Sequence, residues 1–291
     1  MKHTLSVAFG ALLAVPLAAQ PAGENGDPPI TVVGEREADE AQLRREATRF
    51  VDSHGVRTRI GQFARWHEPI CVRTAGLPLE LNARISNRIM DIAESVGVAT
   101  NRADLCRPNV RIGFTSEPQA MVELAARRNP LVIGFHYASQ RGRVMRVRQP
   151  VQAWYVTTTG AGGATATIDQ AGVRASGGSA GSRLSAGISS GLAHVLILAD
   201  TRLVQGEEVD AIAELLAFLA LAQTPVAEAC DDTDTILNLM NPACPPSRRP
   251  VALTRFDIAY LRALYGVNPE WGPQLQRGTL VQHMTNTLGG R

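Results

Sequence analysis

The sequence lacks most of the short motifs that identify a chemistry. It has no phosphate-binding P-loop, no glycine-rich dinucleotide fingerprint and no array of aromatic residues on which bases could stack, and aromatic residues make up only 5% of the chain. No two histidines lie four residues apart, so the zinc-binding pair of a metallopeptidase helix is also missing. The six histidines are His3, His54, His67, His136, His194 and His283.

Lysine is almost absent as well, since Lys2 is the only one. The 29 Lys and Arg residues oppose 27 Asp and Glu, a formal net charge of +2. This balance argues against nucleic acid or an anionic membrane as a partner. The local cluster Arg141, Arg143, Arg146 and Arg148 mostly alternates with apolar residues, which predicts a solvated strand face; a phosphate or RNA site is the alternative.

The N-terminus has the pattern of a secretory signal peptide. Lys2 precedes an uncharged apolar run from Leu5 to Ala19 that ends in small residues. We expect cleavage after Ala19 and a secreted or periplasmic protein. The run is short for a membrane span, so we expect no stable span after cleavage; retention of residues 1–19 as an anchor is the alternative.

Four cysteines, an even number in a chain expected to be exported, predict two disulfides. We favour the pairs Cys71–Cys106 and Cys230–Cys244 because each would close one local unit. A structural zinc site is the rival interpretation, but no two of these cysteines have the close spacing that such a site needs.

The chain divides by pattern into four parts. Residues 1–19 are the expected signal, residues 20–58 a linker with an exposed helix, residues 59–271 one globular domain, and residues 272–291 a C-terminal tail. Helices and strands alternate early and helices dominate late, which predicts an α+β fold. The expected strands cover 69–75, 109–115, 131–135, 151–157 and 194–199, and a long loop or hairpin spans 160–191. The expected helices cover 35–53, 79–96, 117–127, 209–223, 233–239 and 254–265, the last with Thr254 and Asp257 as the two residues of an N-terminal capping box.

The helix expected at 209–223 is apolar apart from Asp210, Glu214 and the final Gln223. Its centre, residues 213–221, resembles the active-site helix of zincin-type zinc metallopeptidases. In their H-E-x-x-H motif two histidines bind zinc and the glutamate polarises the bound water. Ala213 and Ala217 stand here at the two histidine positions, and only Glu214 matches. The resemblance therefore implies a silent site with no metal and no bound cofactor.

Further segments carry the same resemblance to secreted bacterial zincin-like proteins. These are 63–72, 109–114, 234–238 and 252–265, so the likeness extends from Phe63 to Pro269. It implies a zincin-like mixed sheet with a buried active-site-type helix and a C-terminal helix. The alternative is an ordinary core helix that is apolar all round.

Glu214 is informative under either interpretation. An unpaired buried carboxylate costs several kcal/mol or takes up a proton. We therefore expect a hydrogen-bonding partner, with Arg262, Tyr260 or Tyr265 as candidates, or a position at the rim of a cleft. His194 begins an apolar strand and is expected to be a core residue whose hydrogen bonds are satisfied.

Residues 177–181 match G-x-S-x-G, with Ser179 as the would-be nucleophile. That motif needs a hydrophobic strand before it and a helix after it, whereas this stretch is rich in glycine and serine on both sides. Two functions stay open. The first is an exported, non-catalytic zincin-like domain that binds a peptide or protein in a cleft beside the 209–223 helix. The second is a secreted hydrolase that uses Ser179 or a non-standard metal site.

Overall fold

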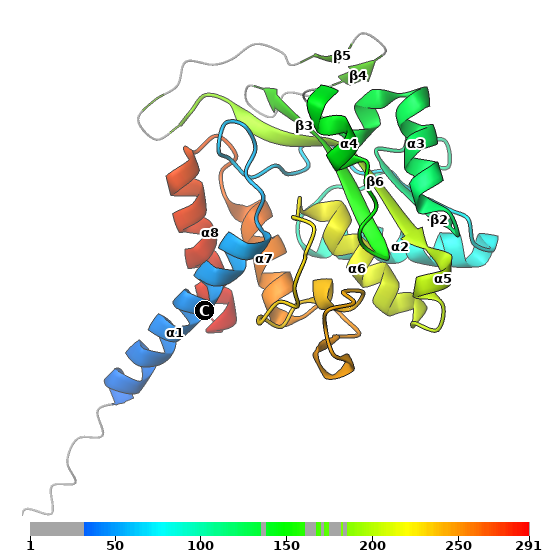
Figure 1. Ribbon diagram of the computed structural model, residues 1–291. Coiled ribbons are helices and arrows are strands. Elements are labelled where there is room, and N and C mark those ends of the chain that lie inside the picture. The colour runs from blue at the N-terminus through cyan, green and yellow to red at the C-terminus, as the bar shows by residue number, and fades with distance from the viewer. Residues whose placement is uncertain are drawn as a thin grey trace, which may run out of the picture.

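The computed structural model describes residues 32–134, 138–160, 167–169, 172–174, 182 and 185–290. The expected signal peptide and Ser179 lie outside these residues. Within them the fold is α+β, with eight α-helices and a four-stranded mixed sheet (Figure 1). None of the helices in this part of the chain is both long and apolar enough to span a membrane.

The four-stranded sheet has the order β1-β2-β6-β3. Strands β1 (Val72–Ala75), β2 (Val110–Thr115) and β6 (Ser189–Asp200) are parallel, and β3 (Val151–Gly160) runs antiparallel to β6 at one edge. Helix α2 (Leu79–Ser95) provides the crossover from β1 to β2 that a parallel pair requires. A separate short pair joins β4 (Thr167–Asp169) to β5 (Gly172–Arg174).

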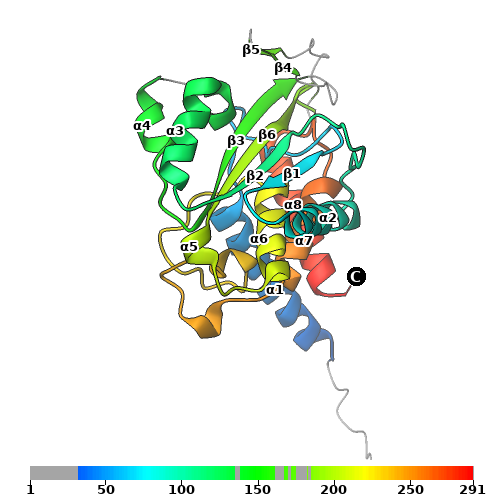
Figure 2. The same ribbon diagram turned by 90° about the vertical axis from the view of Figure 1, so that its right-hand side faces the viewer.

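Helices cover both faces of the sheet (Figure 2). The main core lies under α2, α6 (Val209–Leu221) and α7 (Arg255–Gly266), and the smaller core lies under α3 (Pro118–Arg128). Because side chains alternate along a strand, Val195 and Ile197 of β6 point into the main core while Leu196 and Leu198 point into the smaller one. A strand that is buried on both faces reads as a continuous apolar run, which is why β6 was recognisable in the sequence.

The two terminal helices pack on each other and on α7. Helix α1 (Val32–His54) buries Phe50 against the rings of Phe256 and Tyr260, with centroids 6.0 and 5.5 Å apart. Helix α8 (Pro273–Leu288) buries Leu280 and Met284 completely. Residues 272–291 were expected to be a tail and the helix near 35–53 to be exposed; both segments instead contribute to the main core.

Two expected strands are wrong. Residues 130–133 form the 3₁₀ helix η1 (Pro130–Ile133), because the Asn129 side chain accepts a hydrogen bond from Leu131 N and Pro130 starts the turn. The expected strand in the basic cluster is also absent: η2 (Ala138–Gln140) precedes the cluster, and Arg141 and Arg143 lie in the short helix α4 (Arg141–Val144), which Met145 N closes by donating to Arg141 O. Alternation of basic and apolar residues over so few positions did not distinguish a strand from a helical turn.

The remaining expectations fare better. Both disulfides, Cys71–Cys106 and Cys230–Cys244, form as predicted. Helix α7 begins with the expected capping box, in which Thr254 and Asp257 exchange side-chain and backbone hydrogen bonds. The helix expected at 233–239 is instead the 3-residue 3₁₀ turn η3 (Ile236–Asn238), and a second 3₁₀ turn, η4 (Pro246–Arg248), follows it before α7. Helix α5 (Thr201–Val204) joins β6 to α6. The loop expected over 160–191 is shorter, since β3 runs to Gly160 and β6 begins at Ser189.

Candidate functional site

Helix α6 is a core helix, with every residue from Ala211 to Leu221 buried. Ala213 and Ala217 have no exposed surface. They lie about one helical turn apart and therefore share one face of the helix. The two positions at which the resemblance would place zinc ligands are thus closed off by packing.

Glu214 is held by two partners, neither of which was among the candidates. Its Oε1 accepts a hydrogen bond from Arg88 Nη2 of α2, and its Oε2 accepts one from Leu253 N at 2.5 Å. The carboxylate is only 7% exposed and links α2, α6 and the segment that enters α7. A partner had been expected and is present, but the role of this glutamate in the structure is to join three elements.

The three predicted partners lie elsewhere. Tyr265 donates to Leu221 O at 2.6 Å, and Tyr260 packs on Phe218 with ring centroids 6.0 Å apart. Arg262 lines a hollow between α7 and α8. The three candidates all belong to the helix that was expected at 254–265, whereas Arg88 lies on α2, 126 residues from Glu214 in the sequence.

A cavity of about 60 Å³ lies beside α6, between that helix, β3 and the segment that follows α6. Leu215 and Leu219 line it from α6. At about 100° per residue these leucines lie roughly 200° around the helix from Ala213 and Ala217. The cavity therefore meets α6 on the face away from the alanines, and Glu214 does not line it.

The cavity has an apolar wall and a polar rim. The wall consists of aliphatic side chains from β3, α6 and the chain between α6 and α7, and the rim carries amide and hydroxyl groups. The wall residues are Val151, Ala153, Leu215, Leu219, Val226, Leu237 and Met240; the rim residues are Gln149, Gln152, Tyr155, Thr224 and Asn241. Val226 is 39% exposed, so the cavity reaches the surface beside it. A space of this size suits the end of one aliphatic side chain.

Tyr155 is the only ionisable residue of that lining. Burial raises its pKa to about 12, and a hydrogen bond with Thr224 opposes this only in part. The hydroxyl is therefore neutral at physiological pH. A cavity lined in this way has no general base and no charged group for acid–base chemistry.

One side of the cavity is closed by residues 224–229, which we call the covering segment. Side chains near the start of β3 hold it: Gln149 Nε2 donates to Ala227 O, and Arg148 pairs with Glu228 at 3.1 Å. Tyr155 Oη also lies 3.3 Å from Thr224 Oγ1. Among the described residues, no backbone–backbone hydrogen bond involves the covering segment. Side chains alone keep it in place.

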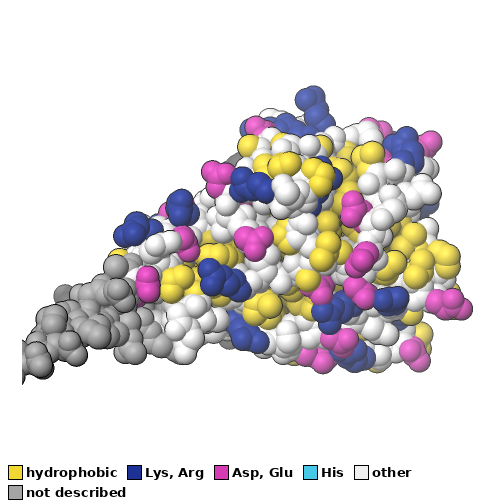
Figure 3. All heavy atoms as spheres, turned by 90° about the horizontal axis from the view of Figure 1, so that it is seen from below, with side chains coloured by type: hydrophobic (Ala, Val, Ile, Leu, Met, Phe, Trp, Pro, Cys, Tyr) yellow, Lys and Arg dark blue, Asp and Glu magenta, His cyan; other side chains and the backbone are white. Residues whose placement is uncertain are grey.

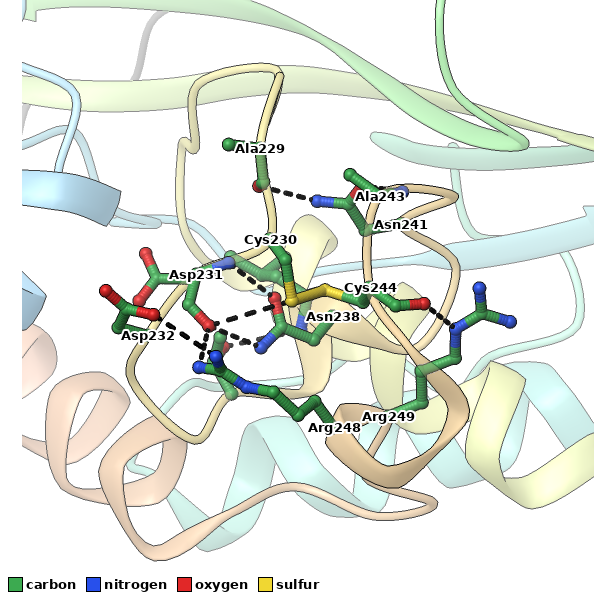
Figure 4. Close-up of a disulfide and its surroundings, with 12 residues drawn as sticks. Ala229, Cys230, Asp231, Asp232, Asn238, Asn241, Ala243, Cys244, Arg248 and Arg249 are labelled. Atoms are coloured by element: carbon green, nitrogen blue, oxygen red, sulfur yellow. Dashed lines mark hydrogen bonds and ion pairs between the residues drawn. A yellow bond between two sulfur atoms is a disulfide. The ribbon is translucent and has the colours of Figure 1, made fainter.

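The bond between Cys230 and Cys244 closes the disulfide loop, residues 230–244 (Figure 4). This loop supplies the wall residues Leu237 and Met240 of the cavity. Asn238 Nδ2 donates to Asp231 O at 3.1 Å, and Asn241 Nδ2 donates to Ala229 O at 2.8 Å. Cys244 closes the loop against Cys230, and its carbonyl accepts from Arg249 Nε at 3.0 Å. These bonds give a loop with little regular structure a defined shape.

A side-chain contact between His54 and Asp231 fixes this loop to the N-terminal helix. Nε2 of the buried His54 lies 3.2 Å from Asp231 Oδ2, while His54 Nδ1 contacts Phe50 O. Burial opposes ionisation of Asp231, but hydrogen bonds from His54 and from the backbone of Thr233 outweigh it and lower the pKa of Asp231 to about 2. Helix α1 therefore supports the loop that forms one wall of the cavity.

His194 lies buried on β6, as expected, but its hydrogen bonds are not satisfied. Neither ring nitrogen has a hydrogen-bond partner within the described residues. Burial, with a smaller contribution from the charge of Arg111, lowers the pKa of His194 to about 4. The residue is a neutral core side chain at physiological pH.

In the described part of the chain, no three His, Cys, Asp or Glu side chains come close enough together to hold a metal ion. Ser179 is not among the described residues. Comparison with protein-family models, with curated proteins and with solved structures finds no match for this chain. A function can therefore be inferred only from the sequence and the structure of this protein.

Proposed function

We propose that this protein is an exported, non-catalytic domain that binds an extended peptide or protein segment at the cavity beside α6. The observation that carries the proposal is the lining: an apolar wall for one aliphatic side chain, a rim of amides and hydroxyls, and no charged group. Binding pockets have this composition when polar groups orient a ligand and apolar groups stabilise it.

The position of the cavity suits an extended ligand. β3 is an edge strand, so its outer edge is not paired with another strand of the sheet. Gly134 limits this edge at one end, because a Cβ on Gly134 would lie 1.7 Å from Tyr155 O. Val151, Gln152 and Ala153 line the cavity, so a ligand side chain bound there would lie beside the start of this edge strand.

A zincin-like ancestry would account for the arrangement. The order of strand, helix, strand, helix, mixed sheet with an antiparallel edge strand, buried helix and C-terminal helix agrees with the resemblance of residues 63–269. Alanine at 213 and 217 removes the metal ligands, and Glu214 has become a tether for Arg88. In this proposal the fold is retained for binding.

Export is the other part of the proposal. Two disulfides are typical of proteins that mature in an oxidising compartment, either secreted or periplasmic. Nothing favours nucleic acid as a partner: on the face shown in Figure 3, basic and acidic side chains are interspersed over the described surface, without a broad basic area.

The test uses the methyl group of Met240, which lines the cavity, as an NMR reporter. Blocked tetrapeptides with a central Leu, Phe, Glu or Arg are added to methyl-labelled protein. We expect the Leu peptide to shift Met240 and to leave Met121, which is not in the lining, unchanged. Ala153→Leu should fill the cavity and abolish the shift.

Two outcomes would contradict the proposal. One is a set of peptides that leaves Met240 unshifted, or that binds equally well to the filled variant. The other is hydrolysis of casein or of a simple ester that is lost in Ser179→Ala, which would favour the hydrolase alternative. Retention of that hydrolysis after treatment with a chelator would separate the serine from a metal site.

A further inference from the structure

A second concave site, independent of the cavity beside α6, lies between α7 and α8. It is a hollow of about 260 Å³ lined by Arg262, Ala263, His283, Asn286 and Thr287. The small, buried Ala263 forms its floor. The other four side chains carry hydrogen-bond donors, and no Asp or Glu lines the hollow.

Arg262 brings an uncompensated positive charge to this hollow. Its side chain is exposed, and no carboxylate or other hydrogen-bond acceptor within the described residues pairs with it. Arg277 of α8 differs, since its Nε and Nη2 both donate to the carboxylate of Asp52. A planar guanidinium with unused donors is well suited to bind an oxyanion with two parallel hydrogen bonds.

A chain of hydrogen bonds sets the orientation of Asn286. Arg44 Nη1 donates to Gln282 Oε1 at 3.1 Å, and Gln282 Nε2 donates to Asn286 Oδ1 at 2.9 Å. Arginine can only donate, so the oxygen of Gln282 must face Arg44 and its nitrogen must face Asn286. The Asn286 oxygen is therefore used, and its NH₂ group is the part left for a ligand.

His283 lies against a glycine, which leaves its ring accessible. A Cβ on Gly266 would come within 3.4 Å of His283 Nδ1, so a larger residue there would cover the imidazole. A neutral imidazole donates from one nitrogen and a protonated one from both. The Thr287 hydroxyl adds a donor at the exposed end of the same hollow.

We propose that this hollow binds a small oxyanion, a phosphate or carboxylate group, with Arg262 supplying the charge and Asn286 and Thr287 supplying neutral donors. Three features of the hollow favour an oxyanion: Arg262 has no partner among the described residues, Asn286 is oriented so that its NH₂ group is left for a ligand, and no acidic residue lines the hollow. The site is separate from the proposed peptide site, so either proposal can fail alone.

The test is a titration of the full chain with inorganic phosphate and, separately, with acetate. Ionic strength is held constant with chloride, and NMR follows the His283 ring and the Asn286 side-chain amide. We expect saturable shifts with phosphate in the millimolar range. Equal affinity for acetate would identify a carboxylate site, and preference for phosphate a phosphoryl site.

Variants make the test specific. Arg262→Gln should weaken binding about tenfold or more, because a charge-assisted hydrogen bond is lost. Asn286→Asp should abolish binding, and Gln282→Met should weaken it severalfold by freeing the amide of Asn286. Arg127→Gln, an exposed arginine of α3, is the matched control and should change nothing. Absence of saturable shifts in the wild-type protein, or unchanged affinity in Arg262→Gln, would overturn the proposal.

Discussion

Arg88 of α2 and Glu214 of α6 join two helices that pack on each other in the main core. The Arg88 side chain is 44% exposed, whereas the Glu214 side chain is only 9% exposed. One turn earlier on α6, Asp210 makes the same kind of contact with Arg84, at 2.6 Å, in an exposed position. The two pairs form a natural comparison of a buried and an exposed ion pair between the same helices.

Glu214→Gln should lower the free energy of unfolding by about 1–2 kcal/mol, and Glu214→Leu by about 2–3 kcal/mol. The carboxylate offers one oxygen to Arg88 and the other to Leu253 N, and glutamine has a single oxygen, so one donor loses its acceptor. Urea denaturation measures both values. Asp210→Asn is the control and should show no resolvable change, because exposed pairs contribute little. Equal effects at 210 and 214 would contradict this account.

Stability should depend on pH through His194. Its folded pKa of about 4 lies below the ordinary value of 6.5, so the unfolded chain takes up a proton first as the pH falls. The free energy of unfolding should therefore decrease from about pH 6.5 to about pH 4, by on the order of 2–3 kcal/mol.

His194→Leu should remove that part of the slope. It should cost little at pH 7, because the replaced ring makes no hydrogen bond to the described residues. Thermal melts at pH 7, 6, 5 and 4 measure the effect in both proteins. Arg111→Gln is a useful companion, since loss of the neighbouring charge should raise the pKa of His194. A wild-type slope that persists in His194→Leu would show that another group is responsible.

Loss of the Cys230–Cys244 disulfide should affect binding as well as stability. In Cys230→Ser/Cys244→Ser the unfolded chain gains conformational entropy, which should lower the free energy of unfolding by about 3 kcal/mol. The loop that carries Leu237 and Met240 is then no longer closed by a covalent bond. The Cys71–Cys106 pair closes a longer loop far from the cavity lining, and its removal should destabilise by a similar or larger amount. Only the first variant should also weaken the binding of the Leu peptide. Weaker peptide binding in both would indicate a general loss of folded protein.

The covering segment should open more readily than its surroundings. Its backbone makes no backbone–backbone hydrogen bond within the described chain, and Gln149 and Tyr155 hold it through side chains. Hydrogen exchange at Val226 and Ala227 should be fast in the wild type, while the neighbouring α6 amides are strongly protected. Gln149→Ala should speed proteolysis within residues 224–229 without changing exchange in α6. Slow exchange of these amides in the wild type would refute a segment held only by side chains.

The sequence was sufficient to predict what depends on local pattern or on simple proximity. The disulfide pairs, the Thr254 capping box, the burial of α6 and the need for a partner at Glu214 all belong to this group. It could not identify Arg88 as that partner, because packing of α2 on α6 brings them together. The apolar segment 131–135 was ambiguous for a different reason, since a short apolar segment suits a strand or a tight turn equally well. The Asn129 side chain, which accepts a hydrogen bond from Leu131 N, stabilises the turn.

The cavity beside α6 could not be predicted from the sequence. It is assembled from β3, α6 and a loop with almost no regular structure, and none of its wall residues is unusual by itself. Helix α8 was missed because its buried residues, Leu280, Val281 and Met284, are few among polar neighbours. Its burial depends on α1, a segment more than two hundred residues earlier in the chain.

The pairing of α1 with α7 and α8 also sets an order of events. Phe50 and its neighbours on α1 are synthesised about two hundred residues before Phe256 and Tyr260, against which Phe50 packs. Until then the apolar side of α1 has no native surface to cover it. Folding of the whole chain must wait for its last segments, and during that interval the early helix is a natural target for chaperones that recognise exposed apolar side chains.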